Sequence, residues 1–166
     1  MTSLKKIQTK IQTLEEAIST VRDWNSSNEK IVFTNGCFDL LHLGHVDYLS
    51  KAKDLGTKLI VGVNSSESVE KLKGPSRPIH SSQTRSTILA AFEFIDLVII
   101  FGDDTPLNLI KTLRPKILVK GGDYNLKTIV GANEVINSGG KVEIIPFLSG
   151  FSTSNIVTKI QSFSKS

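Results

Sequence analysis

The 166-residue sequence predicts an α/β protein, one doubly wound domain with a parallel sheet of about five strands and an extra N-terminal helix. Three observations predict this class. Short apolar runs, typical of strands buried on both faces, alternate with segments of helical periodicity. Glycines and prolines gather mostly between these segments. The balance of 39% hydrophobic and 22% charged residues is that of an ordinary globular domain.

The N-terminal part, residues 1–29, is predicted to be a helical extension. Apolar residues spaced three and four apart over residues 4–24 indicate one amphipathic helix. The turn-prone residues 25–28 end it. Residues 30–166 are then expected to hold the main domain.

Strands and helices alternate through that domain. The predicted strands are residues 31–34, 59–63, 97–101, 117–119 and 142–145. The predicted helices are residues 44–55, 66–72, 82 or 83 to 94, 106–114, 132–138 and 152–163. Gly56 and Pro106 lie at helix ends, where their backbone properties are favourable. A parallel sheet covered on both faces is Rossmann-like, and its ligands bind beyond the carboxyl ends of the strands.

Charge and aromatic content narrow the class of ligand. The net charge is +4, but the lysines and arginines are scattered and aromatic residues make up only 7% of the chain. A nucleic-acid surface usually concentrates both kinds of residue, so no nucleic-acid partner is predicted. A small polyphosphate ligand accounts for the excess positive charge at least as well.

Several features favour a cytoplasmic protein without membrane contact. The longest apolar run, residues 97–101, is far shorter than the roughly 20 residues of a membrane span. Polar residues follow the initial Met1, so no secretory signal is visible. Cys37 is the only cysteine, which excludes an intramolecular disulfide and fits a reducing compartment. One cysteine and the remote third histidine, His80, do not supply the ligands of a structural zinc site, so no protein metal site is predicted.

The turn after the first strand of the main domain is the most informative stretch. Polar residues and glycines gather there, at the place where such sheets bind phosphate. His42 and His45 are three residues apart and share a helix face, and Gly44 between them allows a ligand to approach the backbone. Imidazoles and free helix N–H groups can neutralise phosphate oxygens. Each residue also has a structural interpretation, as a core histidine or a packing glycine.

Gly36-Cys37-Phe38-Asp39 followed by His42-Leu43-Gly44-His45 resembles the signature of the cytidylyltransferase-like superfamily of nucleotidyltransferases. Further elements match it in order over about residues 30–162: Lys71-Leu72-Lys73-Gly74, Ser76-Arg77-Pro78, Gln83-Thr84-Arg85, Lys120-Gly121-Gly122-Asp123-Tyr124 and Gly150-Phe151-Ser152-Thr153-Ser154. This combination looks most like the D-glycero-β-D-manno-heptose 1-phosphate adenylyltransferases. No sugar kinase accompanies it here, so the stand-alone form is expected.

The resemblance implies a reaction of ATP with heptose 1-phosphate to give ADP-heptose, a lipopolysaccharide core precursor, and pyrophosphate. Mg²⁺ is expected on the triphosphate, held partly by substrate oxygens. The histidines His42 and His45 would contact the bridging and transition-state oxygens, and Lys71, Lys73 and Arg85 the leaving pyrophosphate. Isolated lysines are more often solvated surface charges, and Arg85 could be a surface arginine. A homodimer is expected from the resemblance alone.

The remaining candidate residues are assigned to the nucleotide and the sugar phosphate. Thr34, Asn35, Gly36 and Phe38 would frame the nucleotide at the turn with Gly44, and Asp39 would order the turn or a metal-bound water. Lys120 is a candidate contact for the sugar phosphate. Gly121, Gly122 and Asp123 would lie near the base, although adjacent glycines can simply make a tight turn. Ser152, Thr153 and Ser154 suit a helix cap and a phosphate site equally.

Two other functions stay open at this stage. A cytidylyltransferase acting on glycerol phosphate or ethanolamine phosphate with CTP shares both signature elements. A nucleotide sensor could keep the fold and bind ATP without turnover. Cys37 occupies a variable position of the signature and is expected to be a packing residue. No general base is needed, because the sugar phosphate already carries a nucleophilic oxyanion.

Overall fold

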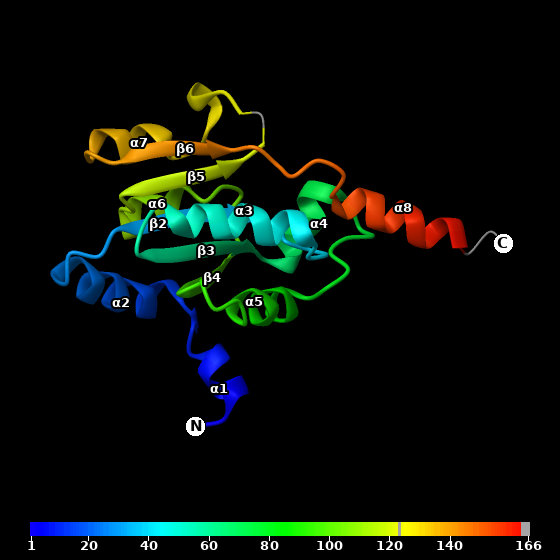
Figure 1. Cartoon of the computed structure of the whole chain (residues 1–166), viewed down its shortest axis with the longest axis horizontal. Coiled ribbons are helices and arrows are strands. Elements are labelled where there is room, and N and C mark those ends of the chain that lie inside the picture. Colours follow the sequence, from blue (N-terminus) through cyan, green and yellow to red (C-terminus); the bar gives the residue numbers. More distant parts are fainter. Residues whose placement is uncertain (123, 164–166) are drawn as a thin grey trace.

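The computed structural model describes residues 1–122 and 124–163, which form a six-stranded sheet with helices on both faces (Figure 1). The strand order is β1-β4-β3-β2-β5-β6, and every neighbouring pair is parallel. The strands are β1 (Ile11–Gln12), β2 (Ile31–Gly36), β3 (Lys58–Asn64), β4 (Leu97–Phe101), β5 (Ile117–Gly121) and β6 (Lys141–Ile145). The predicted α/β class and parallel sheet are confirmed, with six strands instead of five.

Two apolar clusters lie on the two faces of this sheet. Helices α2 (Leu14–Ser26), α6 (Leu107–Leu113) and α7 (Ala132–Asn137) contribute to one cluster, and α3 (Leu43–Asp54) and α5 (Ser82–Ala90) to the other. Along β2, Ile31 and Phe33 join the first cluster and Val32 the second, as the two-residue period of a strand requires. All three are fully buried, which explains why the strand has no polar residue here.

The other helices lie toward the ends of the sheet. They are α1 (Ser3–Gln8), α4 (Ser66–Lys73), α8 (Thr153–Phe163) and the short 3₁₀ helix η1 (Leu126–Thr128). Figure 1 shows α8 reaching away from the sheet, and none of its described residues is buried. Within the described residues, no helix is long and apolar enough to cross a membrane.

The prediction of one helix over residues 4–24 is wrong. Helix α1 ends at Gln8, and β1 pairs with Val98 and Ile99 of β4 before α2 begins. Thr13 caps α2: its backbone N–H donates to Glu16 Oε2 at 2.8 Å, and Glu16 N–H donates to Thr13 Oγ1 at 3.2 Å. This reciprocal capping box stops the first helix from running into the second. The first 29 residues therefore add an edge strand to the sheet.

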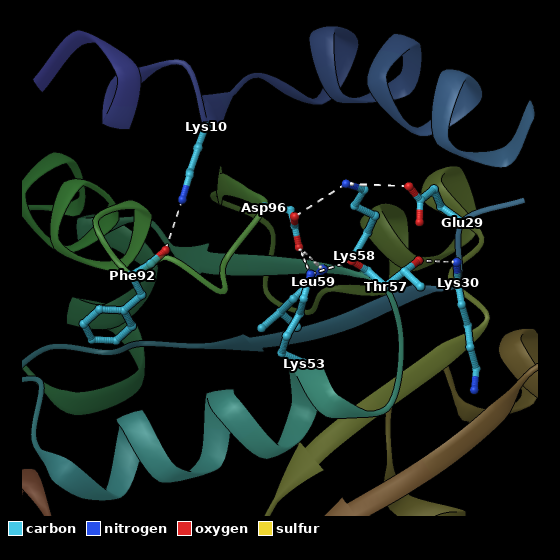
Figure 2. Close-up of polar contacts among 9 residues, drawn as sticks. All are labelled: Lys10, Glu29, Lys30, Lys53, Thr57, Lys58, Leu59, Phe92 and Asp96. Carbon is cyan, nitrogen blue, oxygen red and sulfur yellow. Dashed lines mark hydrogen bonds and ion pairs between the residues drawn. The ribbon is translucent and has the colours of Figure 1, made fainter. Parts of the chain in front are cut away.

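A polar cluster, here called the Asp96 network, joins segments at the amino edge of the sheet (Figure 2). Asp96 Oδ2 accepts hydrogen bonds from Lys53 Nζ at 2.6 Å and from Leu59 N–H at 2.7 Å. Lys58 Nζ lies 3.8 Å from Asp96 Oδ1 and 3.7 Å from Glu29 Oε1. Figure 2 also shows Lys30 N–H donating to Thr57 Oγ1 and Lys10 Nζ donating to the Phe92 carbonyl. The ammonium groups of Lys10, Lys53 and Lys58 are thus matched with acceptors of the protein itself.

The strand order reverses between β2 and β5. From β2 the chain builds β3 and β4 on one side, and it then returns to build β5 and β6 on the other. Loops leaving neighbouring strands in opposite directions open a crevice at the carboxyl ends, where open α/β sheets bind their ligands. Among the predicted site residues, Asn35, Gly36 and Lys120 lie at the carboxyl ends of these two strands, and Phe38 and Asp39 follow β2.

Candidate active site

A pocket of about 280 Å³ opens at the carboxyl ends of β2 and β5. The residues that line it are Asn35, Gly36, Cys37, Phe38, Asp39, His45, Tyr48, Lys73, Lys120, Gly121, Tyr124, Phe147 and Thr153. Nine of these were predicted as site residues. A larger and more open hollow of about 640 Å³ lies near Lys30, Arg114 and Lys116, but no predicted site residue lines it. The chemistry predicted from the sequence therefore converges on the smaller pocket.

The two histidines of the signature stack on each other at the start of α3. Their ring centroids are 3.9 Å apart, and His42 N–H donates to His45 Nδ1 at 3.4 Å. Gly44 is buried beside them. A larger residue would be crowded there, because its Cβ would lie 3.0 Å from His42 Nδ1 and 3.1 Å from Phe151 Cβ. His45 lines the pocket, whereas His42 lies behind it and orients it.

Burial makes His45 a neutral imidazole near pH 7. Desolvation, followed by repulsion from His42 and Lys73, lowers the pKa of His45 to about 4. Burial also lowers the pKa of His42. Because His45 Nδ1 accepts a hydrogen bond, the neutral ring carries its proton on Nε2. His45 thus supplies an N–H donor to the pocket without a fixed charge.

Asp39 holds the signature turn to the loop that precedes α5. Its carboxylate is buried and accepts hydrogen bonds from Arg77 Nε at 2.5 Å, Ile79 N–H at 2.8 Å and His80 N–H at 3.0 Å. Burial alone would raise the pKa of Asp39, but the backbone donors His80 and Ile79 and the Arg77 guanidinium together lower it. Asp39 is therefore an ionised organiser of the turn, the first of the two roles predicted for it.

Arg85 reaches the same turn from α5. Its side chain is only 1% exposed, with Nε donating to the His80 carbonyl at 3.0 Å and Nη1 to the Cys37 carbonyl at 2.6 Å. Among the described residues, its Nη2 has no hydrogen-bond partner. Desolvation lowers the pKa of Arg85, and Asp39 and Cys37 oppose that shift. In this arrangement, the guanidinium supports the walls of the pocket rather than lining it.

The two candidate lysines lie on α4, not beyond its end. Helix α4 runs through Lys73, and Gly74 with a φ of +94° terminates it. The helix predicted over residues 66–72 therefore runs one residue further and includes both lysines. Lys73 lines the pocket, whereas Lys71 is exposed outside it. Lys73 is in addition close enough to lower the pKa of His45.

Lys120 places a second cation on the opposite wall. Its Nζ lies 3.4 Å from Asn35 Oδ1 and 5.7 Å from the centroid of the Tyr124 ring. Desolvation lowers the pKa of Lys120, an effect that Cys37 opposes. A partly buried ammonium with an amide and a ring as neighbours, rather than a carboxylate, favours an incoming anion.

Aromatic residues that the sequence analysis did not select line one end of the pocket. Tyr48 is buried with its hydroxyl 2.5 Å from Thr34 Oγ1, and burial raises the pKa of Tyr48 to about 12. The Phe147 ring meets the Tyr48 ring edge-on at 5.9 Å. The helical spacing of His45 and Tyr48 was a usable signal for Tyr48. Nothing in the sequence pattern marked Phe147, which follows β6.

The last predicted element lies at the start of α8. Ser152 Oγ accepts from Asn155 N–H at 3.0 Å, so Ser152 is a helix cap. Thr153 lines the pocket and donates from Oγ1 to the Leu40 carbonyl at 3.3 Å. Ser154 is exposed. Gly122 follows β5 with a φ of +107°, and Asp123 lies outside the described residues.

The described part of the chain offers no cluster of three or more His, Cys, Asp or Glu side chains that could hold a metal ion. Among the described residues, Asp39 supplies the only carboxylate on the pocket wall, and both of its oxygens already accept hydrogen bonds. Residues 1–122 and 124–163 thus do not form a protein cage for Mg²⁺. They do form a cationic and N–H-rich surface suited to the oxygens of a polyphosphate.

A family model for cytidylyltransferase-like proteins matches residues 33–159, which span this pocket. The chain belongs to the cytidylyltransferase-like family of nucleotidyltransferases. It is 49% identical over 151 residues to the bifunctional protein HldE of Geobacter sulfurreducens, a match covering 91% of this chain and 31% of that protein. HldE of Campylobacter jejuni subsp. jejuni serotype O:2 is 52% identical over 161 residues, covering 96% of this chain and 33% of that protein.

The chain therefore spans about a third of the length of these curated relatives. Among solved structures, a lipopolysaccharide core biosynthesis protein from Thermoplasma volcanium aligns with a TM-score of 0.57 at 24% identity. That alignment covers 72% of this chain and 97% of the other. At this identity the likeness shows the fold alone.

Proposed function

We propose that the chain transfers the adenylyl group of ATP to D-glycero-β-D-manno-heptose 1-phosphate, giving ADP-heptose and pyrophosphate. The observation that carries this proposal is the pocket at the β2–β5 reversal. It joins a neutral His45 N–H donor with two cations, Lys73 and Lys120, that have no carboxylate partner among the described residues. The motifs that resemble heptose 1-phosphate adenylyltransferases, and the identity of about half to HldE proteins, support this choice of substrates.

In the proposed reaction, an oxygen of the sugar phosphate attacks the α-phosphorus of ATP. One P–O bond forms there, and the bond from the α-phosphorus to the bridging oxygen breaks, so that pyrophosphate leaves with the electron pair. The protein's contribution is to position the reactants and stabilise the spreading negative charge. Residues 30–166 would form the nucleotidyltransferase domain, acting as a homodimer in the cytoplasm.

The roles follow from where each side chain lies. His45 would donate from Nε2 to the oxygens around the α-phosphorus, with His42 stacked behind it. Lys73 would neutralise the leaving pyrophosphate, and Lys120 would hold the sugar phosphate. Lys71, exposed at the rim, would reach the pyrophosphate only from outside the pocket. Mg²⁺ would arrive on the ATP phosphates and neutralise part of their charge, since the described residues supply no cage for it.

Pyrophosphate release by the whole chain tests the proposal. ATP and CTP are each offered with heptose 1-phosphate, glycerol 3-phosphate and ethanolamine phosphate. We expect release only with ATP and heptose 1-phosphate. Release with CTP and an alcohol phosphate would identify the chain as a cytidylyltransferase instead. Binding of ATP without release in any combination would identify a sensor, and both results would overturn the proposal.

A further inference from the structure

Phe147 stands out among the pocket residues because a large apolar side chain is left 60% exposed beside polar groups. It lies on the segment that follows β6 and belongs to none of the sequence motifs discussed above. Its place on a pocket wall makes this exposed ring available to a ligand, because small-molecule pockets are lined largely by apolar and aromatic side chains. Nothing in the transfer chemistry of His45, Lys73 and Lys120 uses it.

The Phe147 ring rests directly on a pair of glycines. A Cβ on Gly121 would lie 2.4 Å from Phe147 Cε1, and a Cβ on Gly122 would lie 3.0 Å from Cε2. Tyr48 then contacts the ring edge-on. The glycine pair therefore does more than make a turn, because it provides the space that lets an aromatic ring pack onto the end of β5.

The pocket consequently has two chemically different ends. His45 and Lys73 come from the helices that follow β2 and β3, whereas Tyr124 and Phe147 follow β5 and β6, where Phe147 meets Tyr48 and the Lys120 ammonium lies over the Tyr124 ring. Charged phosphate oxygens suit the first end. A planar ring suits the second end, because aromatic side chains stack favourably on nucleobases.

A sugar suits the aromatic end less well than a base does. The Tyr48 hydroxyl is buried and bonded to Thr34 Oγ1, so it is not free to bind sugar hydroxyls. Tyr124 offers the one further hydroxyl among these three rings. A polyhydroxylated ligand lying on these rings would therefore depend on the Tyr124 hydroxyl and the neighbouring Lys120 to replace its hydrogen bonds to water.

We propose that Phe147 is the stacking platform for the nucleobase of the nucleotide substrate, held in place by Gly121, Gly122 and Tyr48. This inference rests on the proposed function, because it assumes that a nucleoside triphosphate occupies the pocket. The base lies on the exposed part of the Phe147 ring, and the phosphates extend toward His45 and Lys73. Phe147 then determines affinity for the nucleoside part and leaves affinity for the phosphates unchanged.

Calorimetric titration of the whole chain with two probes separates these contributions. The probes are a non-hydrolysable ATP analogue and inorganic tripolyphosphate, each with Mg²⁺. We expect Phe147→Ala to weaken binding of the ATP analogue about 10-fold, within the usual range for one base stacked on one aromatic ring. Binding of tripolyphosphate should stay within 2-fold of wild type, about the precision of such a comparison. Phe147→Tyr should restore binding of the analogue.

Two further variants provide the controls. Gly121→Ala should reproduce the selective loss, because its methyl group displaces the Phe147 ring. Phe163→Ala removes an equally exposed aromatic ring from the far end of α8 and should change neither affinity. An unchanged affinity of Phe147→Ala for the ATP analogue overturns the inference. Equal losses for both probes, or a higher KM for the sugar phosphate alone, overturn it as well.

These titrations, together with the pyrophosphate-release assay described above, separate this inference from the proposed function. If wild-type protein binds the ATP analogue and releases pyrophosphate while Phe147→Ala behaves identically, only the stacking platform is wrong. If wild-type protein binds neither probe and releases no pyrophosphate, the proposed function fails first.

Discussion

Asp39 and Asp96 lie at the carboxyl and amino ends of the strands of one sheet. Asp39 gathers its donors from the single loop of residues 77–80, and Asp96 gathers its donors from the end of α3 and the start of β3. Asp96 accepts from a lysine and a strand N–H and lies near a second lysine. Asp39 is more deeply buried and accepts from Arg77 and two loop N–H groups. Both carboxylates hold the chain together, but Asp39 lines the pocket that holds the predicted site residues, and Asp96 does not.

The difference lies in the cations that surround each carboxylate. In the Asp96 network, Lys53 and Lys58 are both paired with acids. Around the pocket, Lys73 and Lys120 have no carboxylate within ion-pair distance among residues 1–122 and 124–163. Paired lysines stabilise a fold, whereas unpaired cations in a crevice are available to the phosphates of a ligand. Under the proposed function, the side chains at the amino ends of the strands stabilise the fold, and those at the carboxyl ends bind the ligand.

The largest expected effect comes from a substitution in the pocket at the carboxyl ends of the strands. His45→Ala removes the neutral donor, and we expect turnover to fall by about 10²–10³-fold, the usual loss for one preorganised charge-stabilising group. Its unfolding temperature should stay near that of wild type. The matched control is His80→Gln, because the His80 side chain does not line the pocket. Near-normal pyrophosphate release by His45→Ala would contradict the role proposed for the pocket.

Asp39→Asn probes the carboxylate that serves both the pocket and the fold. Removing its charge leaves the Arg77 guanidinium without its ionic partner, and we expect a loss of about 3 kcal/mol in the free energy of unfolding. Turnover should fall too, because the signature turn loses its link to residues 79 and 80. Urea unfolding and pyrophosphate release measure the two effects. A loss below about 1 kcal/mol would show that Asp39 does not organise the turn.

Asp96→Asn is the matched change at the amino ends of the strands. The ion pairs of Asp96 are partly exposed, and Lys53 Nζ keeps its contact with the Thr57 carbonyl. We expect a loss of about 1 kcal/mol or less in the free energy of unfolding, with turnover unchanged. If turnover fell as far as in Asp39→Asn, the division between the two ends of the strands would be wrong.

The last expected effect is a pH dependence of stability. The folded His45 ring stays neutral down to a pKa of about 4, whereas in the unfolded chain the ring takes up a proton near its ordinary value of 6.5. Between these values the unfolded state binds more protons, so lowering the pH reduces the free energy of unfolding. His45→Ala should flatten this slope between pH 6.5 and 4. Phe163→Ala removes no titrating group and should keep it. Equal slopes for His45→Ala and wild type would contradict a neutral His45.

The sequence predicted the centre of the sheet well because its strands are apolar throughout. Residues 31–34 and 97–101 have no competing helical period, and they lie within or coincide with β2 and β4. The residues between Gly36 and His45 were recognisable because they resemble the signature of the cytidylyltransferase-like superfamily. Gly36 and His45, at the two ends of that segment, both line the pocket.

The N-terminal segment was harder because its apolar spacing fits one helix as well as two. Its division depends on the pairing of Ile11 with Val98, a contact between residues far apart in sequence. One local signal was present, since Thr13 and Glu16 have the spacing of a capping box. The burial of Arg85 had no local signal at all, because its partners are backbone carbonyls at residues 37 and 80.

Strand β1 is only two residues long, yet it lies against β4, whose sequence Leu97-Val98-Ile99-Ile100-Phe101 is entirely apolar. A bare β4 edge would offer unpaired backbone groups and apolar side chains to another chain, the usual starting point of edge-to-edge aggregation. Residues 1–12 therefore act as a protective border for the sheet. A recombinant fragment beginning at residue 13 would keep α2 and every pocket residue but lose this protection, so its solubility rather than its chemistry would suffer.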